Sequence, residues 1–108
     1  MREAVRRAGQ TCPVEVAVTV LGGSWKLTAV KVLLEGTIRS AELARRIPNA
    51  PARSLTRALR ELEADGIVER TIYPEVPPHV EYSLTPQGQG LTGIVAAMDA
   101  WGQNYLNT

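Results

Sequence analysis

The chain has 108 residues, of which 44% are hydrophobic and 21% charged, and its formal net charge is +1. This length and composition predict one globular domain that spans residues 1–108. No apolar run approaches the roughly 20 residues of a membrane span, and no signal-peptide pattern follows the basic N-terminus, so we expect a cytoplasmic protein without a membrane partner.

The first half of the chain is expected to form four helices, bounded by prolines, glycines and capping residues. They cover residues 13–21, 25–35, 40–48 and 51–65. Cys12 stands at the cap position of the first helix, and Gly66 supplies the left-handed residue that closes the fourth. The last two helices are joined by a tight turn, so residues 40–65 are a helix-turn-helix candidate.

Beyond Gly66 the apolar period changes from 3.6 to 2, which predicts two strands, one from Val68 and one over 80–84. The proline-rich segment Pro74–His79 lies between them and is expected to be a projecting loop. Strands and loop make a β-hairpin wing over about 67–84. Thr85 then caps a last helix, over about 86–106. The predicted fold is mainly α with a small β-hairpin wing, a winged helix-turn-helix.

Charge is unevenly distributed along this predicted fold. Residues 39–60 contain six arginines against one acid, Glu42, whereas residues 61–81 contain six acids against one arginine, Arg70. Within the helix over 51–65, leucines follow the spacing of a buried stripe and arginines lie on the opposite side. Since the net charge is small, any binding of a polyanion must depend on this arrangement.

In a helix-turn-helix the second helix enters the major groove, with its N-terminal part nearest the bases. The candidates for base contacts are therefore Arg53, Ser54 and Arg57, because arginine can donate two hydrogen bonds to a guanine edge. The candidates for backbone contacts are Arg39, Arg45, Arg46, Arg60 and His79. The alternatives are a solvated arginine face with pairs such as Arg57 with Glu61, a helix-dipole role for Arg45 and Arg46, and a solvated loop histidine.

Cys12 is the only cysteine, which excludes an intramolecular disulfide. At a helix N-terminus the free amides and the dipole favour a thiolate, so Cys12 is a candidate redox or electrophile sensor. The alternative is an inert buried thiol, because a single cysteine is often a small apolar side chain of the core and the nearby Glu15 favours the neutral form.

The last helix carries an apolar stripe that is wide for the end of a small domain, and two-fold pairing with a second copy would bury it. The expected homodimer interface, formed with the first helix, comprises Val14, Val18, Leu91, Ile94, Val95, Met98, Trp101 and Tyr105. No catalytic set, metal-ligand cluster or phosphate-binding loop is visible, so we expect no cofactor, no metal and no enzyme activity.

Several segments resemble the HxlR-type winged-helix transcription regulators. They are Cys12-Pro-Val-Glu15, Gly22-Gly-Ser-Trp-Lys-Leu27, Leu34-Glu-Gly36, the run from Leu59 to Arg70, Tyr73-Pro-Glu-Val-Pro-Pro78 and Val80-Glu-Tyr-Ser-Leu-Thr-Pro86. The resemblance implies a homodimer formed by the terminal helices, a recognition helix at 51–65 and a wing at 73–80. It also implies that in some members the cysteine of the Cys-Pro motif, here Cys12, senses oxidants. The chain departs from the family pattern at Ser24, where lysine is common, and at Ser40-Ala41.

Together these features predict a sequence-specific regulator of transcription that binds double-stranded DNA as a homodimer and responds to redox or electrophile stress through Cys12. The sequence identifies no small-molecule effector. One alternative is a winged-helix module that binds protein and not DNA, which the acidic segment 61–81 would serve. Another is a thiol-reactive enzyme with Cys12 as its nucleophile.

Overall fold

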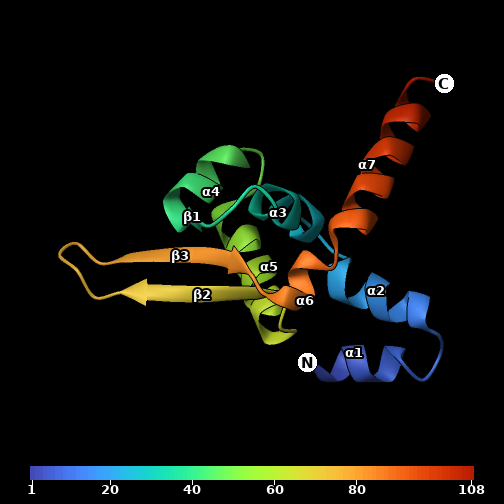
Figure 1. The fold of residues 1–108 in the computed structure, drawn as a ribbon, viewed down its shortest axis with the longest axis horizontal. Helices are drawn as coiled ribbons and strands as arrows, with labels where there is room; N and C mark the ends of the chain where they lie inside the picture. Colours follow the sequence, from blue (N-terminus) through green and yellow to red (C-terminus); the bar gives the residue numbers. More distant parts are fainter.

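The computed structural model describes residues 1–108, as seven helices and three strands (Figure 1). In chain order they are α1 (Glu3–Ala8), α2 (Pro13–Leu21), α3 (Lys26–Leu33), β1 (Ile38–Arg39), α4 (Ser40–Arg46), α5 (Ala52–Ala64), β2 (Val68–Tyr73), β3 (His79–Leu84), α6 (Pro86–Gln89) and α7 (Thr92–Leu106). The predicted fold class is confirmed, because helices predominate and the strands form one small antiparallel sheet of order β1-β3-β2.

The helix-turn-helix expected over 40–65 is formed by α4 and α5. Leu55, Leu59 and Leu62 are buried on the inner side of α5, as their spacing predicts. Gly66 closes the helix with φ 75°, in the left-handed region that glycine adopts without a steric penalty. The amide of Ile67 then donates to the carbonyl of Leu62 at 2.9 Å, which satisfies one of the free carbonyls at the helix end.

The wing is the hairpin of β2 and β3, with a register that runs from Val68 opposite Leu84 to Tyr73 opposite His79. The two residues of β1, just before α4, add a third strand against β3. The prediction that the loop extends through His79 is wrong, because His79 pairs with Tyr73 and is the first residue of β3.

A single hydrophobic cluster of 13 buried residues joins the helix-turn-helix to its support. Its largest fully buried side chains come from α3, α4 and α5, namely Leu33, Leu43, Leu62 and Val30. Tyr82 of β3 and Val95 of α7 are also part of this cluster. Helix α5 is therefore held by α3 on one side and by the hairpin on another, which fixes the position of its outer face.

The last helix, expected to run unbroken over 86–106, is divided into α6 and α7. The Thr85 cap is confirmed, since its hydroxyl accepts the amide of Gly88 at 3.1 Å. A side chain at Gly88 would collide with the carbonyl of Ile67, so this short helix needs glycine where it meets the end of α5. The turn after Gln89 brings α7 back onto the core.

Because of this turn, two of the residues expected at the dimer interface pack against the core of the single chain, which corrects that expectation. Val95 is 8% exposed and belongs to the core cluster, and Leu91 is half-buried against the same cluster. Both side chains stabilise the fold of the single chain, because the first turns of α7 pack on α3. The remaining apolar residues of α7 stay exposed.

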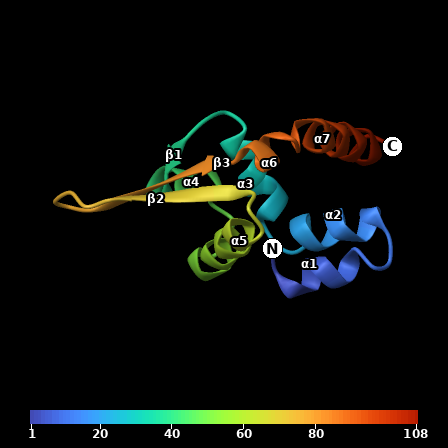
Figure 2. The same cartoon turned by 60° about the horizontal axis from the view of Figure 1, so that its bottom comes forward.

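Helix α1 was not expected from the sequence. It has six residues and only one buried side chain, Val5, and it lies beside α2 in both views (Figures 1 and 2). The α1–α2 pair and the projecting α7 lie at the opposite end of the molecule from the wing tip. No single helix is long and apolar enough to cross a membrane; α2 and α3 reach that length only as a pair, bent by 84°.

Candidate nucleic-acid interface

Helix α5 separates its charges along its length. Its first part carries arginines and its last part, with the residue that follows, carries acids: Arg53, Arg57, Arg60, then Glu61, Glu63 and Asp65. Arg53 and Arg60 are exposed and form no ion pair, and the side chain of Arg57 is 82% exposed. The arginine side chains therefore lie on the outer face of α5, free to meet an anionic partner.

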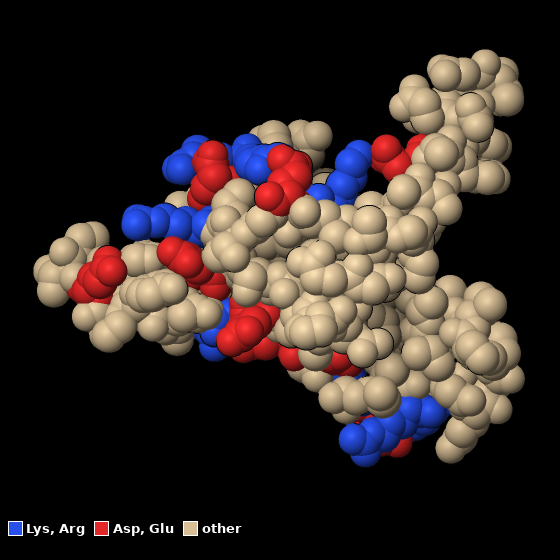
Figure 3. All heavy atoms as spheres, viewed as in Figure 1, with Lys and Arg blue, Asp and Glu red and all other residues tan.

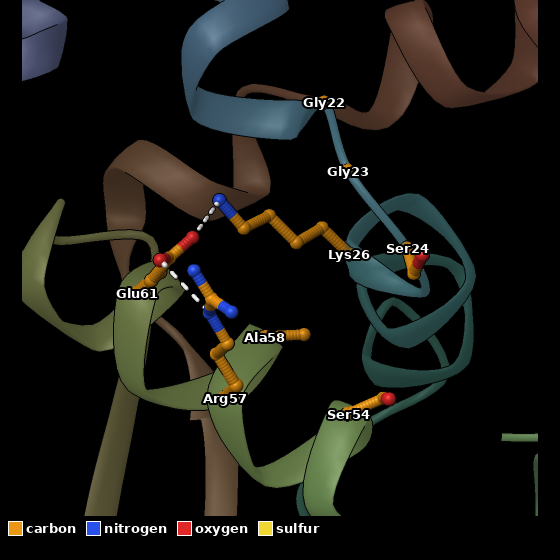
Figure 4. A pocket seen from close by; sticks show the side chains of 8 residues that line it. All are labelled: Gly22, Gly23, Ser24, Lys26, Ser54, Arg57, Ala58 and Glu61. Carbon is orange, nitrogen blue, oxygen red and sulfur yellow. Dashed lines mark ion pairs between the residues drawn. The ribbon is translucent and has the colours of Figure 1, made fainter. Parts of the chain in front are cut away.

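A shallow pocket of about 220 Å³ lies between α5 and the loop that joins α2 to α3 (Figure 4). Ser54 and Arg57 line it from α5, and Gly22, Gly23 and Ser24 line it from the loop. The loop begins α3 from an unusual backbone, because Trp25 has φ 74°. Ser54 is half-buried in this arrangement, whereas its neighbours Arg53 and Arg57 project freely.

Lys26 is a buried charged residue, at 3% exposure. Its ammonium lies 2.7 Å from Oε1 of Glu61, and Nε of Arg57 lies 3.7 Å from Oε2 of the same carboxylate (Figure 4). The hydrogen bond from Lys26 lowers the pKa of Glu61 below its usual value; burial opposes this effect, and the charges of Lys26, Arg2 and Arg57 add to it. Glu61 is therefore a charged carboxylate at neutral pH.

Arg2 binds the far end of α5. Its backbone nitrogen and its Nε donate to the two carboxylate oxygens of Asp65, at 2.8 and 2.9 Å. Burial raises the pKa of Asp65, but the hydrogen bonds and positive charge of Arg2, with the charge of Lys26, outweigh burial and hold that pKa below its usual value. With Arg70 3.4 Å from Glu63, every acid in this part of α5 faces a cation from another element.

The arginines predicted to contact the DNA backbone differ in whether they already have a carboxylate partner. Arg39 and Arg60 are exposed and make no ion pair. Arg45 lies 3.0 Å from Glu42, and Arg46 lies 2.7 Å from Glu35. These two arginines are exposed but already have carboxylate partners on the surface.

His79 is not a free loop side chain. Its ring stacks on Tyr73, with the centroids 4.6 Å apart, and the side chain is 15% exposed. Nδ1 lies 2.9 Å from Glu75 and Nε2 lies 3.2 Å from Glu81. The expectation of a solvated histidine at the wing tip is therefore wrong, and a contact from His79 to DNA would require the ring to leave both carboxylates.

An apolar surface lies at the other end of the molecule. On α7 the exposed fractions are 40% for Ile94, 51% for Met98, 67% for Trp101 and 65% for Tyr105. Trp101 and Tyr105 stack with ring centroids 5.1 Å apart. On α2, Val14 and Val18 are exposed as well. Figure 3 shows that the outer part of α7 carries no charged side chain on the face in view.

Cys12 is a free thiol at the cap position of α2, as predicted, and it is half-buried. Its side chain makes no capping hydrogen bond. No group of His, Cys, Asp and Glu side chains is placed to hold a metal ion.

Sequence reasoning missed the cations that pair with the acids of α5. Lys26 carries a recognisable signal, because it precedes Ala29, Val30 and Leu33 at the i, i+3, i+4, i+7 spacing of a buried stripe. A charged residue in such a stripe indicates a buried ion pair. Arg2 carries no comparable signal, since its partner Asp65 lies 63 residues away.

Comparisons with known proteins agree with this geometry. The model of the family described as HxlR-like helix-turn-helix matches residues 20–108. An HTH-type transcriptional regulator of Methanothermobacter thermautotrophicus is 49% identical over 94 residues, which are 87% of this chain and 72% of that protein. The oxidised form of the redox regulator HypR matches with a TM-score of 0.80 and 48% identity, over 86% of this chain and 96% of that one. The diamide-treated form of YodB from Bacillus subtilis matches with a TM-score of 0.72 and 37% identity, over 87% and 94%.

Proposed function

This chain belongs to the HxlR-like helix-turn-helix family of transcriptional regulators, and we propose that it binds operator DNA as a homodimer with α5 in the major groove. The observation that carries the proposal is the state of the charges on α5. Its arginines are exposed, and two of them are unpaired, whereas each of its acids faces a cation from another element. This arrangement leaves positive charge available on the outer face and reduces the repulsion of phosphate by the acids.

Arg53, Ser54 and Arg57 are the proposed base-reading residues. They stand in the first two turns of α5, where Arg53 and Arg57 project on the side opposite the buried leucines and Ser54, half-buried, lines the pocket. Arginine donates to the O6 and N7 atoms of guanine in a planar fork, and serine adapts to either partner because its hydroxyl both donates and accepts. The weak 3.7 Å pair of Arg57 with Glu61 is exposed enough to break when a base edge replaces the carboxylate.

Arg39 and Arg60 are the proposed phosphate contacts that need no rearrangement, since neither has a carboxylate partner. Arg45 and Arg46 are proposed to exchange Glu42 and Glu35 for phosphate, which costs little because these pairs are on the surface. His79 is the weakest of the proposed contacts, because both of its ring nitrogens already face carboxylates, those of Glu75 and Glu81.

The homodimer is proposed to form through the exposed apolar face of α7 with α2. In the two-fold arrangement that most homodimers adopt, each Trp101 and Tyr105 would be covered by the second copy. Aromatic side chains with this exposure dominate the energetics of interfaces. The wing tip lies at the opposite end of the molecule from α7, and α5 lies between them, so we expect this contact to leave the outer face of α5 open (Figures 1 and 2).

Cys12 is proposed to make DNA binding sensitive to oxidants. Two of the similar structures are described as an oxidised redox regulator and a diamide-treated regulator. Here the thiol stands two residues before Val14, on the same helix as the proposed dimer contacts. Diamide would take two electrons and two protons from Cys12 and a second thiol, supplied by a small molecule or by the second subunit, and leave a disulfide.

The base-reading proposal is tested with a duplex that the protein selects from a random-sequence library. We expect Arg57→Ala to weaken binding to that duplex by about 1–3 kcal/mol and binding to unselected DNA by much less. An equal loss on both kinds of DNA would show that Arg57 contacts phosphate only. If no duplex is selected, or if affinity is insensitive to salt, the alternative of a module that binds protein is favoured, because phosphate contacts weaken steeply as salt rises.

The redox proposal is tested by measuring affinity for the same duplex before and after diamide. We expect the wild-type protein to change its affinity and Cys12→Ser to keep it. If both proteins respond alike, Cys12 is not the sensor.

We infer a cytoplasmic location and a role without catalysis, consistent with a family of transcriptional regulators. Turnover of a thiol-reactive substrate that is lost in Cys12→Ser would contradict that role.

A further inference from the structure

Arg2 connects the N-terminal segment to the end of the recognition helix. Its NH2 group donates to the carbonyl of Thr19 in α2 at 2.9 Å and lies 2.8 Å from Oδ2 of Asp65. Its NH1 group lies 3.5 Å from Oε1 of Glu61. The side chain of Arg2 is 24% exposed and that of Asp65 is 1% exposed. One arginine thus contacts two carboxylates at the end of α5 and a carbonyl of α2. Arg2 itself lies outside residues 20–108, which the family model matches.

Glu61 is shared by three cations that arrive from different places. Lys26 faces Oε1 and Arg57 faces Oε2 (Figure 4). Arg2 also faces Oε1. Arg57 is the outermost of the three, with its side chain 82% exposed, and has the longest ion-pair distance. The more completely the other two cations compensate Glu61, the less this carboxylate competes with DNA for Arg57.

We propose that Arg2 is a positioning residue for DNA recognition, which acts by compensating Glu61 and Asp65 so that Arg57 stays available to the DNA. The inference rests on the proposed role of Arg57 as a base-reading residue. Arg2 is not proposed to touch DNA, because its guanidinium is occupied by Asp65, Glu61 and the carbonyl of Thr19.

Counting formal charges shows the size of the effect. With Arg2 in place, Glu61 and Asp65 face two cations, Arg2 and Lys26, and their local charge is zero. Without Arg2, the same two carboxylates face Lys26 alone, and a net charge of −1 lies beside Arg57. This change is the loss of the positive charge of Arg2 that repels Arg57, and it strengthens the pair of Arg57 with Glu61 at the expense of DNA.

The test is a double-mutant cycle on affinity for the selected duplex, with the proteins wild type, Arg2→Ala, Arg57→Ala and Arg2→Ala/Arg57→Ala. We expect Arg2→Ala to weaken binding about fivefold in the wild-type background and by less than about twofold when Arg57 is already absent. A loss in the second background equal to that in the first would overturn the proposal, since Arg2 would then act on DNA directly or through the fold. Far-ultraviolet circular dichroism at the temperature of the assay confirms that each protein is folded.

Two further variants distinguish a local effect of Arg2 from a general effect of net charge. Arg6→Ala removes an equal charge from an exposed arginine of α1 that has no ion pair, and we expect it to change affinity by less than about twofold. Arg2→Lys keeps the charge without the planar fork, and we expect it to retain most of the affinity. If Arg6→Ala weakens binding as much as Arg2→Ala does, the effect belongs to net charge and the proposal is wrong. If the wild-type protein selects no duplex, the proposed function itself fails, which is a separate result.

Discussion

Replacing Glu61 by glutamine should lower the free energy of unfolding by about 2 kcal/mol. The amide keeps the shape and one hydrogen-bond acceptor, so the change removes the negative charge and replaces the second acceptor by a donor. At 2.7 Å from Lys26, with an effective dielectric constant near 20, the lost attraction is about 6 kcal/mol before any solvation is considered. Breaking a fully buried pair costs roughly 3–5 kcal/mol. The cost is smaller here because Glu61 is 31% exposed and the adjoining pocket admits water to the ammonium.

The measurement is urea unfolding at neutral pH and low salt, at one protein concentration, because self-association would make the apparent stability depend on concentration. Glu42→Gln is the matched control. It makes the same chemical change on a helix, at a carboxylate whose partner Arg45 is 71% exposed. We expect the control to cost less than about 0.5 kcal/mol. An equal, small loss in both variants would refute the reasoning, because it would show that water solvates Lys26 as well as Glu61 does.

Asp65 and Trp101 are each expected to contribute to a measurable equilibrium, unfolding in one case and dimerisation in the other. The pKa of Asp65 is lowered in the folded protein, so its contribution to stability is present above its ordinary value of 3.8 and is lost as pH falls through the lower folded value. Between pH 6 and pH 3, Asp65→Asn should therefore lose less unfolding free energy than the wild-type protein, and an unchanged pH dependence would contradict the role of this carboxylate. Trp101→Ala should weaken the homodimer by about 2 kcal/mol or more, roughly 30-fold in Kd by sedimentation, because burial of a tryptophan dominates an interface. Gln103→Ala on the same helix should leave Kd unchanged, and equal effects would place the interface elsewhere.

Much of the fold could be predicted because its signals are local. The leucine spacing of α5, the closing Gly66 and the Thr85 cap each depend on a few adjacent residues. Helix α1 escaped prediction because six residues with one buried side chain have no apolar period. The break before α7 escaped it because the stripe continues across Leu91, although Gly88 and Gly90 stand just before it. The low helix propensity of these glycines indicated a break, whereas the apolar pattern indicated one continuous helix, and the pattern was misleading.

The candidate interface was predictable only in part, for a related reason. The exposed arginines of α5 follow from helical periodicity within one segment. Their electrostatic surroundings do not, because Glu61 and Asp65 receive their partners from residues 35 and 63 positions away, Lys26 and Arg2. The acids after Arg60 gave the impression of a separate acidic face. In the structure Glu61, Glu63 and Asp65 are paired with cations, so the charge imbalance read from the sequence overstates the negative charge that DNA would meet beside α5.

Helix α3 has contacts with both proposed functional surfaces. At its start Lys26 pairs with Glu61 of α5, and further along Lys31 lies 2.7 Å from Asp99 of α7. Leu27, one turn before Lys31, lines a pocket shared with Met98 of α7. We therefore expect a change in the packing of α7 on a second copy to affect the helix that supports α5. Substitutions on the outer faces of α5 and α7 should separate DNA binding from dimerisation, whereas a core substitution in α3 should impair both, since it moves the common support of the two surfaces.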